Sequence, residues 1–393
     1  MISETPNAGA AATTADYTLW QLVAYALKLG SLGFGGPVAL VGYMHRDLVE
    51  RRNWISEADY KDGLALAQMA PGPLAAQLAI YLGYVRFRVL GATAVGLAFV
   101  LPSFFMVVGL GWAYVHFGGL PWMQAAFYGV GACVIGIIAN SAIKLTRRTV
   151  GHDRLTWGIY GVLALATAIT ETEIVWLFLL AGVLAWIVKT PPAWLARPHA
   201  RSMAWPMALG LITLWPGGTL WNIFLFFTKA GAFVFGSGLA IVPFLYGGVV
   251  KEFHWLNEQQ FVDAVAVAMI TPGPVVITVG FIGFLVAGFA GATIAALGTF
   301  LPCYLFTVIP APYFKKYSRR PDIHAFVSGV TAAAVGAITG AVFVLGRRSI
   351  VDVPTASLAV GTLLLCWKVK KIPEPIIVLG AALVGLAVRA WRG

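Results

Sequence analysis

Hydrophobic residues fall in long runs along almost the whole chain, and short segments between the runs carry most of the charge. A helix needs about 20 consecutive apolar residues to cross the hydrocarbon core of a bilayer. The runs are too long and too uniformly apolar for the alternating strands of a membrane barrel. The pattern predicts helical membrane segments at residues 17–43, 61–85, 89–113, 122–143, 155–169, 174–188, 219–250, 261–285, 289–313, 324–346, 354–368 and 374–390, with a shorter apolar run at 203–215.

The composition supports this interpretation. Hydrophobic residues make up 59% of the chain and charged residues 11%, whereas a soluble domain carries about 25% charged residues. We therefore expect an all-α polytopic membrane protein in a lipid bilayer, with 10–13 transmembrane segments because some of the runs in the pattern are short.

The net charge of +11 would suggest a nucleic-acid partner in a soluble protein. Here the basic residues form clusters between the apolar runs, such as 144–154 and 315–320. The positive-inside rule accounts for such clusters, so no nucleic acid is expected. The first 16 residues lack the basic region of a signal peptide and are interpreted as a mobile tail.

Residue types that carry enzyme chemistry are sparse. Cys133, Cys303 and Cys366 lie far apart in apolar runs, so neither a metal site nor a disulfide framework is supported. The six histidines are scattered, and no GxxxxGK[ST] motif occurs. A membrane enzyme or assembly factor is the alternative class. We instead expect no enzymatic activity, no metal and no cofactor.

The chain contains a long internal repeat. The motif FGGP at 34–37 is answered by FGSG at 235–238, and APGP at 70–73 by TPGP at 271–274, with a constant shift (235 − 34 = 201). Trp54 answers Trp255 and Lys28 answers Lys229 at the same shift. We therefore expect two homologous halves, at 17–202 and 219–393, joined by a connecting segment at 203–218. Repeats of this kind are typical of transporters.

Loop charges predict that the halves have opposite orientation. Arg86 and Arg88 follow the second run of the first half, whereas the equivalent loop 286–291 carries no charge. Conversely, 315–320 is strongly basic and 117–121 is uncharged. Inverted-topology repeats follow from the positive-inside rule, although Arg347 and Arg348 oppose this bias. The run 203–215 would then have to cross or half-cross the membrane.

The repeated motifs predict helices that are broken inside the membrane. Proline lacks the backbone N–H and clashes with the preceding turn, so Pro-Gly-Pro at 71–73 and 272–274 interrupts a helix. The freed backbone groups must find partners or line a cavity. A helix that restarts after the break presents free N–H groups and a positive dipole end, which suit an anion. Simple kinks and close helix packing through glycine are the alternatives.

Charged and polar residues near the breaks complete the candidate site. Lys28 and Lys229 lie inside apolar runs, where a lysine is a functional candidate because burial is costly; we expect buried cations facing a cavity, and snorkelling is the alternative. Asp62 and Asp263 either complement a helix dipole or take part in proton coupling. The expected substrate-binding residues are Lys28, Phe34, Gly35, Gly36, Pro37, Gln68, Pro71, Gly72, Pro73, Gln77, Lys229, Gly236, Ser237, Thr271, Pro272, Gly273, Pro274 and Thr278.

The sequence resembles the chromate ion transporter family, in its long-chain two-domain type. The resemblance is carried by FGGP at 34–37, by ALAQMAPGPLAAQLAIYLGY at 65–84, and by the weaker copies FGSG and AMITPGP. It implies secondary active export of chromate across a bacterial inner membrane and resistance to chromate. Sulfate, which is similar in shape and charge, is an alternative substrate, and a channel or carrier for another anion is the alternative function. A homodimer is left open.

Overall fold

The computed structural model describes residues 15–33, 36–117, 121–151, 153–170, 175–191, 218–232, 235–236, 241–314, 320–350, 352–369, 372 and 374–392. These residues form an almost entirely helical protein, which confirms the predicted all-α class. Helices long and apolar enough to cross a membrane lie at Leu74–Phe117, Ala125–Arg147, Val275–Val308 and Pro321–Val344. Shorter apolar helices lie at Arg154–Thr170, Trp176–Lys189, Val353–Lys368 and Ile376–Trp391.

The first repeat begins with short helices on either side of the predicted breaks. They are α1 (Leu19–Leu32), α2 (Gly36–Met44) continued by the π-helical η1 (His45–Arg51), α3 (Glu57–Met69), strand β1 (Gly72–Pro73) and α4 (Leu74–Phe117). Ser56 caps α3 by accepting the N–H of Asp59, as its Ser-x-x-Asp spacing predicts. A turn at Arg88 (φ 53°) divides α4 into a short arm (74–87) and a long arm (89–117).

These helices form two hairpins that enter and leave at the same end of the molecule. The Tyr17 ring stacks on Trp54 (5.2 Å between centroids) and meets the edge of Phe87 (5.7 Å). The segments 17–54 and 57–87 therefore each begin and end at the same end of the molecule. The runs 17–43 and 61–85 are thus not single crossings as predicted, because arms of 13 and 14 residues are only about 20 Å long.

The second repeat has the same order of elements. It comprises α8 (Thr219–Ala232), strand β2 (Phe235–Gly236), α9 (Val242–Tyr246), the π-helical η3 (Gly247–Glu252), α10 (Glu258–Ile270), the 3₁₀ turn η4 (Val275–Ile277) and α11 (Thr278–Val308). Asn257 and Gln260 form a capping box at the start of α10. A turn at Ala287 and Gly288 divides α11 into a short arm (278–286) and a long arm (289–308).

The two repeats are inverted relative to each other. The long arms of α4 and α11 occupy equivalent positions in the repeats and run antiparallel. The hydroxyl groups of Thr93 and Tyr304 lie 2.7 Å apart at one end. Further along, Phe104 meets Phe289 with 6.1 Å between ring centroids. The opposite orientation predicted from the loop charges is therefore confirmed.

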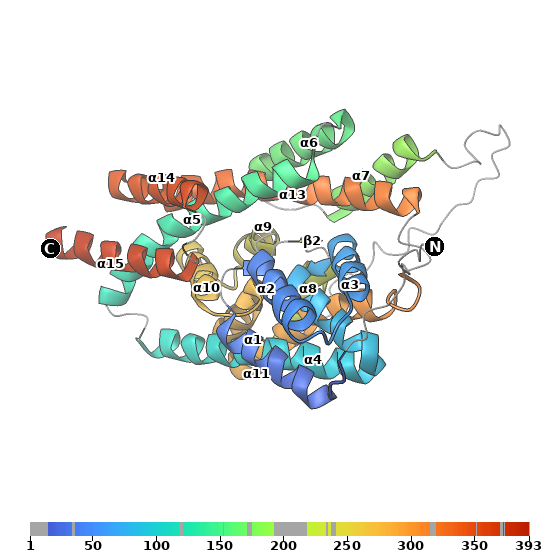
Figure 1. The fold of residues 1–393 in the computed structure, drawn as a ribbon. Coiled ribbons are helices and arrows are strands. Elements are labelled where there is room, and N and C mark those ends of the chain that lie inside the picture. Colours follow the sequence, from blue (N-terminus) through green and yellow to red (C-terminus); the bar gives the residue numbers. More distant parts are fainter. Residues whose placement is uncertain are drawn as a thin grey trace, which may run out of the picture.

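A second layer of helices covers the hairpins (Figure 1). It contains α5 (Pro121–Thr149), α6 (Arg154–Thr170), α7 (Val175–Lys189), α13 (Pro321–Ser349), α14 (Val353–Lys368) and α15 (Glu374–Arg392). The repeats exchange partners in this layer: α5 of the first repeat packs against α14 and α15, and α13 of the second repeat packs against α6 and α7.

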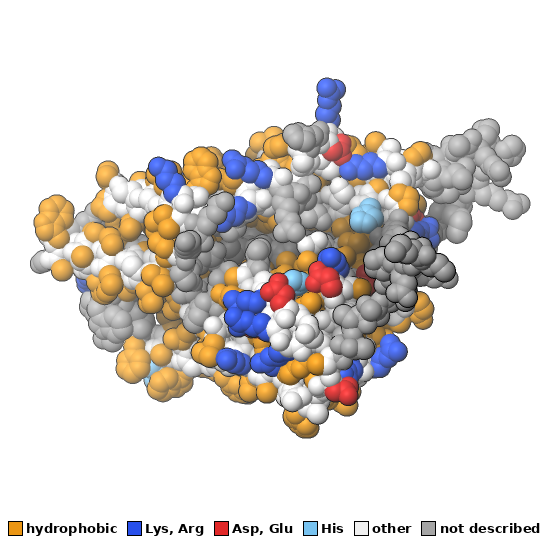
Figure 2. Space-filling model, viewed as in Figure 1, with side chains coloured by type: hydrophobic (Ala, Val, Ile, Leu, Met, Phe, Trp, Pro, Cys, Tyr) orange, Lys and Arg blue, Asp and Glu red, His pale blue; other side chains and the backbone are white. Residues whose placement is uncertain are grey.

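Glycines allow this exchanged packing in equivalent places. A Cβ atom at Gly129 would collide with the carbonyl oxygen of Ala381, and one at Gly329 would collide with that of Ala181. Close approach through small residues is how helices associate where lipid removes the hydrophobic driving force. Large apolar side chains such as Phe105, Leu165 and Leu383 are exposed, and Figure 2 shows hydrophobic side chains spread over the visible face of the molecule.

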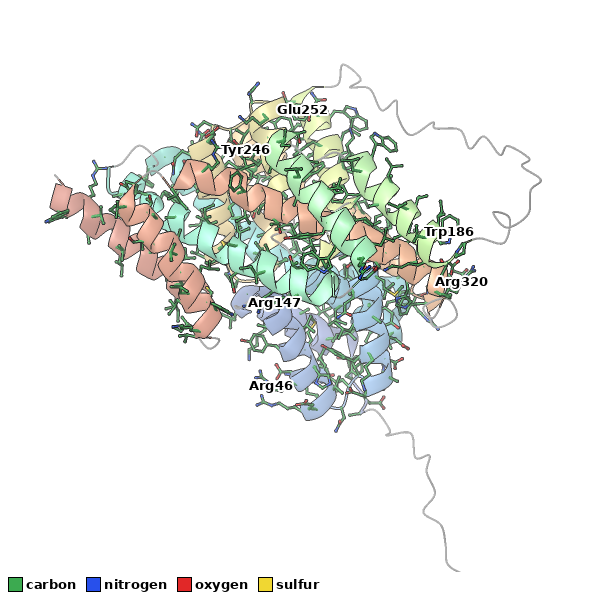
Figure 3. The ribbon with its side chains drawn as sticks, turned by 90° about the horizontal axis from the view of Figure 1, so that it is seen from above. Arg46, Arg147, Trp186, Tyr246, Glu252 and Arg320 are labelled. Carbon is green, nitrogen blue, oxygen red and sulfur yellow. The ribbon has the colours of Figure 1, made fainter. Side chains whose placement is uncertain are left out.

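Charge separates the two ends of the molecule. At one end, Lys189 Nζ lies 2.6 Å from Asp153 Oδ2 and 3.3 Å from Ser328 Oγ, which joins α6, α7 and α13. The Lys189 ammonium lowers the pKa of the Asp153 carboxyl. Figure 3 shows Arg46 and Arg320 on this side and Glu252 on the other. We call it the basic end, because its elements carry Arg46, Arg51, Arg52, Lys61, Arg86, Arg88, Lys144, Arg147, Arg154, Lys189, Arg320 and Lys368.

The opposite end carries fewer basic residues. Tyr128, near the start of α5, donates a hydrogen bond to Asp352, which caps α14. Arg347 lies near the C-terminal end of α13, which is at this end of the molecule. It therefore opposes the charge bias, as the sequence indicated. The segment 203–215 lies outside the described residues. At the N-terminal side, Ala15 N–H donates to Asn53 and Asp16 forms an ion pair with Arg86, so these two residues of the expected tail are attached to the first hairpins.

Candidate functional site

The breaks of one repeat meet the breaks of the other. Strands β1 and β2 pair in parallel, with Gly72 opposite Phe235 and Pro73 opposite Gly236. The Pro-Gly-Pro break of the first repeat is thereby joined to the glycine-rich break of the second. Backbone groups that would be unsatisfied in a membrane find partners across the pseudo-symmetric interface.

The reciprocal pair is also joined. The N–H of Gly273 donates to the carbonyl oxygen of Gly33 at 3.0 Å, so the Pro-Gly-Pro break of the second repeat meets the end of α1. Both contacts connect hairpins that enter from opposite ends of the molecule. The four breaks therefore converge in the middle of the protein, as expected from the inverted repeat.

The central glycine of each Pro-Gly-Pro motif has a backbone conformation that disfavours other residues. Gly72 has φ 143° and Gly273 has φ 94°. A Cβ atom at Gly72 would lie 2.7 Å from Gln77 Cδ, and one at Gly273 would collide with Ser103 Oγ. Glycine is required at both positions by conformation and by space.

Ser103, which the sequence analysis did not select, supports one of these breaks. It is buried in the long arm of α4, and its hydroxyl lies 2.7 Å from the carbonyl oxygen of Pro272 and 3.2 Å from that of Gly30. The signal was present as a serine after Leu101-Pro102 in an apolar run. At the equivalent position after Leu301-Pro302 the second repeat has Cys303, so this support differs between the repeats.

Gln77 is fully buried beside the first break. Its Nε2 donates to the carbonyl oxygen of Pro71 at 2.7 Å, while its Oε1 has no hydrogen-bond partner among the described residues. The side chain therefore holds the break in shape. It retains a second N–H on the amide nitrogen and a free acceptor oxygen.

The threonines of the second repeat bond to their own backbone. Thr271 donates to Val267 O at 2.6 Å and Thr278 donates to Val275 O at 2.8 Å. Since a hydroxyl has one proton to donate, neither donates to a ligand in this conformation. A role of Thr271 and Thr278 in binding stays a prediction.

Helix N-termini are the donors that the arrangement offers. α2 begins at Gly36, α4 begins at Leu74 directly after β1, and the η4 turn begins at Val275 directly after Pro274. The first N–H groups of a helix have no partner within it, and the dipole is positive at this end. Pro37 is half-buried, whereas Pro73 and Pro274 are buried. The donors that this arrangement offers are therefore mainly backbone groups at helix N-termini.

Both lysines are exposed, and the expectation that they are buried is wrong. Lys28 on α1 and Lys229 on α8 lie about one turn before their breaks, on the side of the helix away from the buried residues Leu29 and Ala230. In the described part of the chain neither forms an ion pair. A long flexible side chain can keep its ammonium hydrated in this way.

The two aspartates differ in environment. Asp263 is 3% exposed, and it accepts hydrogen bonds from Tyr114 Oη and Gln259 Nε2, each at 2.8 Å. Asp62 is only half-buried. Gln68 is exposed at the end of α3. Phe34, Gly35 and Ser237 of the expected site lie outside the described residues, and Gly36 and Gly236 are described by their backbone.

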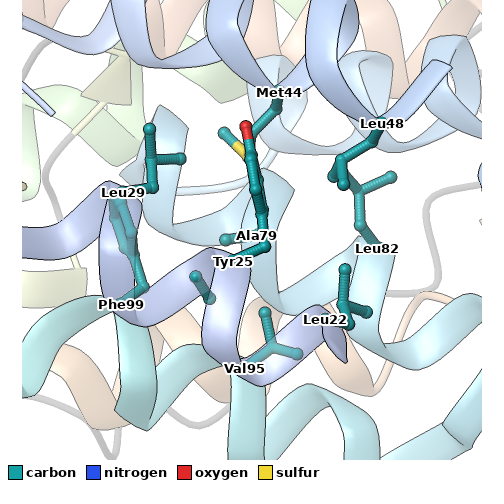
Figure 4. Close-up of a pocket in the computed structure, with 10 residues that line it drawn as sticks. Leu22, Tyr25, Leu29, Met44, Leu48, Ala79, Leu82, Val95 and Phe99 are labelled. Atoms are coloured by element: carbon teal, nitrogen blue, oxygen red, sulfur yellow. The ribbon is translucent and has the colours of Figure 1, made fainter. Parts of the chain in front are cut away.

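An enclosed apolar cavity lies elsewhere, within the first repeat (Figure 4). Its volume is about 10 Å³, about the size needed to hold one water molecule. Such a lining cannot stabilise an anion, so we regard it as a packing gap. It is bounded by Leu22, Tyr25, Ala26, Leu29, Met44, Leu48, Ala79, Leu82, Val95 and Phe99. No cluster of metal-ligating side chains occurs in the described residues.

The architecture defines the class of protein. Two inverted helical repeats, with interrupted helices that meet at mid-depth, form the arrangement of membrane transporters. The family model described as "Chromate transporter" matches the chain twice, at residues 20–186 and 221–386. The chain belongs to the chromate transporter family, and the two matches confirm the repeat.

Similar proteins extend over nearly the whole chain. It is 68% identical over 386 residues to a chromate transport protein of Cupriavidus metallidurans, covering 98% of this chain and 96% of that protein. It is 31% identical over 400 residues to a chromate transport protein of Pseudomonas aeruginosa, covering 95% and 93%. No solved structure matches the chain.

Proposed function

We propose that this protein exports chromate across the bacterial cytoplasmic membrane as a secondary active transporter and thereby confers resistance to chromate. The observation that carries the proposal is the pairing of all four breaks across the two repeats, at β1–β2 and at Gly273–Gly33. This pairing gathers helix N-termini at one depth, where a small oxyanion would be bound.

The binding residues would act in two groups. Backbone groups of the motifs at 34–37, 71–73, 236–237 and 272–274 would contact the oxyanion. Gln77 would hold the first break and offer its remaining N–H, and Thr271 and Thr278 would shape the second. Lys28 and Lys229, exposed about one turn before the breaks, would supply positive charge along the approach, and Gln68 would offer a neutral amide for hydrogen bonding there. Asp62 and Asp263 are candidates for coupling transport to protons.

The charge distribution suggests the orientation. Cytoplasmic loops of membrane proteins carry an excess of lysine and arginine, so the basic end would face the cytoplasm. The crossing or half-crossing predicted for 203–215 lies outside the described residues and stays a prediction.

Chromate uptake into proteoliposomes tests the proposal. Purified protein should take up labelled chromate when an imposed proton gradient drives it, and a protein-free vesicle should not. In cells, expression should lower the steady-state chromate content. A well-folded preparation without chromate flux under any imposed gradient would refute the proposal.

Sulfate is the comparison substrate, because it shares the tetrahedral shape and the double negative charge of chromate. We expect sulfate to compete in the same assay. Uptake of sulfate with no uptake of chromate would instead support the sulfate carrier. The oligomeric state stays a prediction: a homodimer would be detected by the mass of the purified detergent-solubilised protein.

A further inference from the structure

The two equivalent hairpins that carry Pro-Gly-Pro between their arms have different surroundings. In the second repeat, α10 packs against α5 and α15 of the outer layer and against α4. In the first repeat, α3 occupies the equivalent position, but the described residues show no comparable packing against α13 or α7. The pseudo-twofold relationship of the repeats is broken at this place.

Exposure of equivalent side chains shows the same difference. Ala266 on α10 is 1% exposed and Met269 is buried. Their equivalents on α3, Ala65 and Gln68, are half-buried and exposed. Asp263 is likewise buried where Asp62 is half-buried.

A tyrosine of the first repeat fastens α10 in place. Tyr114, near the end of the long arm of α4, donates its hydroxyl to Asp263. Its ring also packs edge-on against Phe127 of α5 (5.8 Å between centroids) and Phe281 of α11 (5.6 Å). A single side chain thus joins α4, α5, α10 and α11 towards the opposite end of the molecule.

A crevice occupies the equivalent place in the other half of the pseudo-symmetric structure. It has a volume of about 260 Å³ and separates α3 from the end of α11 and the start of α13, towards the basic end. Its walls are apolar on both sides. They are formed by Leu66, Met69, Ala70 and Pro71 on one side and by Phe306, Pro310, Tyr313, Phe314, Ile323 and Val327 on the other.

The residue equivalent to Tyr114 is one of those wall residues. Asp62 corresponds to Asp263 at the shift of 201. Beyond the second break the shift falls to 200, as Leu101-Pro102 and Leu301-Pro302 show, so position 114 corresponds to Phe314 (314 − 114 = 200). Phe314 has the same ring but no hydroxyl. Phe314 therefore cannot donate a hydrogen bond of the kind that Tyr114 donates to Asp263.

We propose that Tyr114 is a positioning residue that latches the α10 hairpin shut at the opposite end, and that the structure is the conformation open at the basic end. This inference rests on the proposed transport function. In the alternate conformation, α3 would close the crevice against α11 and α13, and α10 would separate from Tyr114. Because a protein moves between two such states according to their relative free energies, the missing hydroxyl at Phe314 biases the equilibrium towards the observed state.

Cysteine labelling at matched positions tests the assignment of the observed conformation as open at the basic end. In a background with Cys133, Cys303 and Cys366 replaced by alanine, Ala65→Cys and Ala266→Cys would be labelled separately with a membrane-impermeant maleimide, in vesicles of known orientation. We expect Ala65→Cys to react at least tenfold faster than Ala266→Cys, and only from the basic end. Equal rates would overturn the assignment of the conformation.

Two variants then test the latch. Tyr114→Phe removes the hydroxyl, and Phe314→Tyr adds one at the equivalent position. Each should slow labelling of Ala65→Cys several-fold and speed labelling of Ala266→Cys from the opposite end. A merely structural role for Tyr114 would raise labelling at Ala266→Cys without lowering it at Ala65→Cys, and this result would overturn the proposal, as would unchanged rates in both variants.

A matched control removes another hydrogen bond between the repeats. Tyr160 Oη bonds to Thr339 Oγ1 at 3.1 Å within the outer layer, so Tyr160→Phe should leave both labelling rates unchanged. Labelling does not require chromate. If the labelling pattern is as expected in a protein that does not transport chromate, the proposed latch is supported and the proposed substrate is wrong. If chromate is transported but the labelling pattern is not as expected, only the proposed latch is wrong.

Discussion

The hydroxyl of Ser103 lies 2.7 Å from the carbonyl oxygen of Pro272, and it is buried. This contact joins a crossing helix of the first repeat to the helix break of the second. The candidate anion site is therefore assembled by both repeats, and this contact joins residues 169 positions apart in the chain.

Replacing Ser103 should weaken this assembly. In Ser103→Ala the carbonyl oxygens of Pro272 and Gly30 lose a buried donor, so we expect a loss of about 1–3 kcal/mol of stability and reduced chromate flux. Ser103→Cys, which introduces the residue found at the equivalent position 303, should be milder. Thermal unfolding in detergent and proteoliposome flux would measure both. An alanine variant with unchanged stability and flux would contradict the supporting role.

The glycines of the breaks should not tolerate a side chain. Gly273→Ala adds a Cβ that collides with Ser103 at a backbone φ of 94°, and we expect chromate flux to fall at least tenfold. Gly380→Ala is the matched control, since a Cβ there meets no atom within 4 Å. Membrane levels of both variants should be compared by immunoblot. Normal flux in Gly273→Ala would show that the break does not need this conformation.

The exposed lysines should affect substrate affinity more than the fold. For Lys28→Ala and Lys229→Ala we expect the KM for chromate to rise roughly threefold to tenfold, equivalent to about 0.7–1.4 kcal/mol, with normal protein levels. Lys28→Arg should retain most affinity. Lys61→Ala, which removes an exposed lysine paired with Glu57, serves as the surface control. If both alanine variants have the KM of the unmodified protein, the lysines are not counter-charges.

Glycine packing in the outer layer should decide whether the repeats assemble. In Gly329→Leu the added Cβ atom would collide with the carbonyl oxygen of Ala181 and would lie 2.6 Å from the Cβ of Ala185. We expect a strongly destabilised protein that aggregates on solubilisation. Gly361→Leu, at a position with open space around the Cβ, should behave normally. Fluorescence-detected gel filtration of the two variants would distinguish these outcomes, and a monodisperse Gly329→Leu protein would show that the exchange tolerates a larger separation.

Some features of the site followed from local chemistry and were therefore predictable. Pro71-Gly72-Pro73 and Pro272-Gly273-Pro274 break their helices because proline cannot continue the backbone hydrogen bonds. The capping residues Ser56 and Asn257 start helices where their spacing indicated. The loop charges around Arg86 and in 315–320 indicated inversion, because orientation in a membrane follows the distribution of lysine and arginine.

Other features depended on contacts between distant segments. The hydropathy of 17–43 and 61–85 is that of a crossing helix, and only the meeting of Tyr17, Trp54 and Phe87 shows that each segment belongs to a hairpin. Lys28 and Lys229 were expected to be buried because their neighbours in sequence are apolar. Burial of a helical residue depends, however, on whether its side of the helix packs against other segments. The packing of α1 and α8 in the folded protein leaves Lys28 and Lys229 on the exposed side.

The membrane class, the repeat and the positions of the four breaks could be predicted, since hydropathy, proline and glycine act within a few residues. The folded structure was needed to show which break meets which, that α5 and α13 exchange partners, and that Tyr114 reaches Asp263 while Phe314 borders an open crevice. These arrangements depend on packing between segments up to about 250 residues apart (381 − 129 = 252), whose free energies no local pattern contains. The asymmetry between the two equivalent hairpins is the clearest case, because the sequences of α3 and α10 show the repeat but not which helix packs against the outer layer.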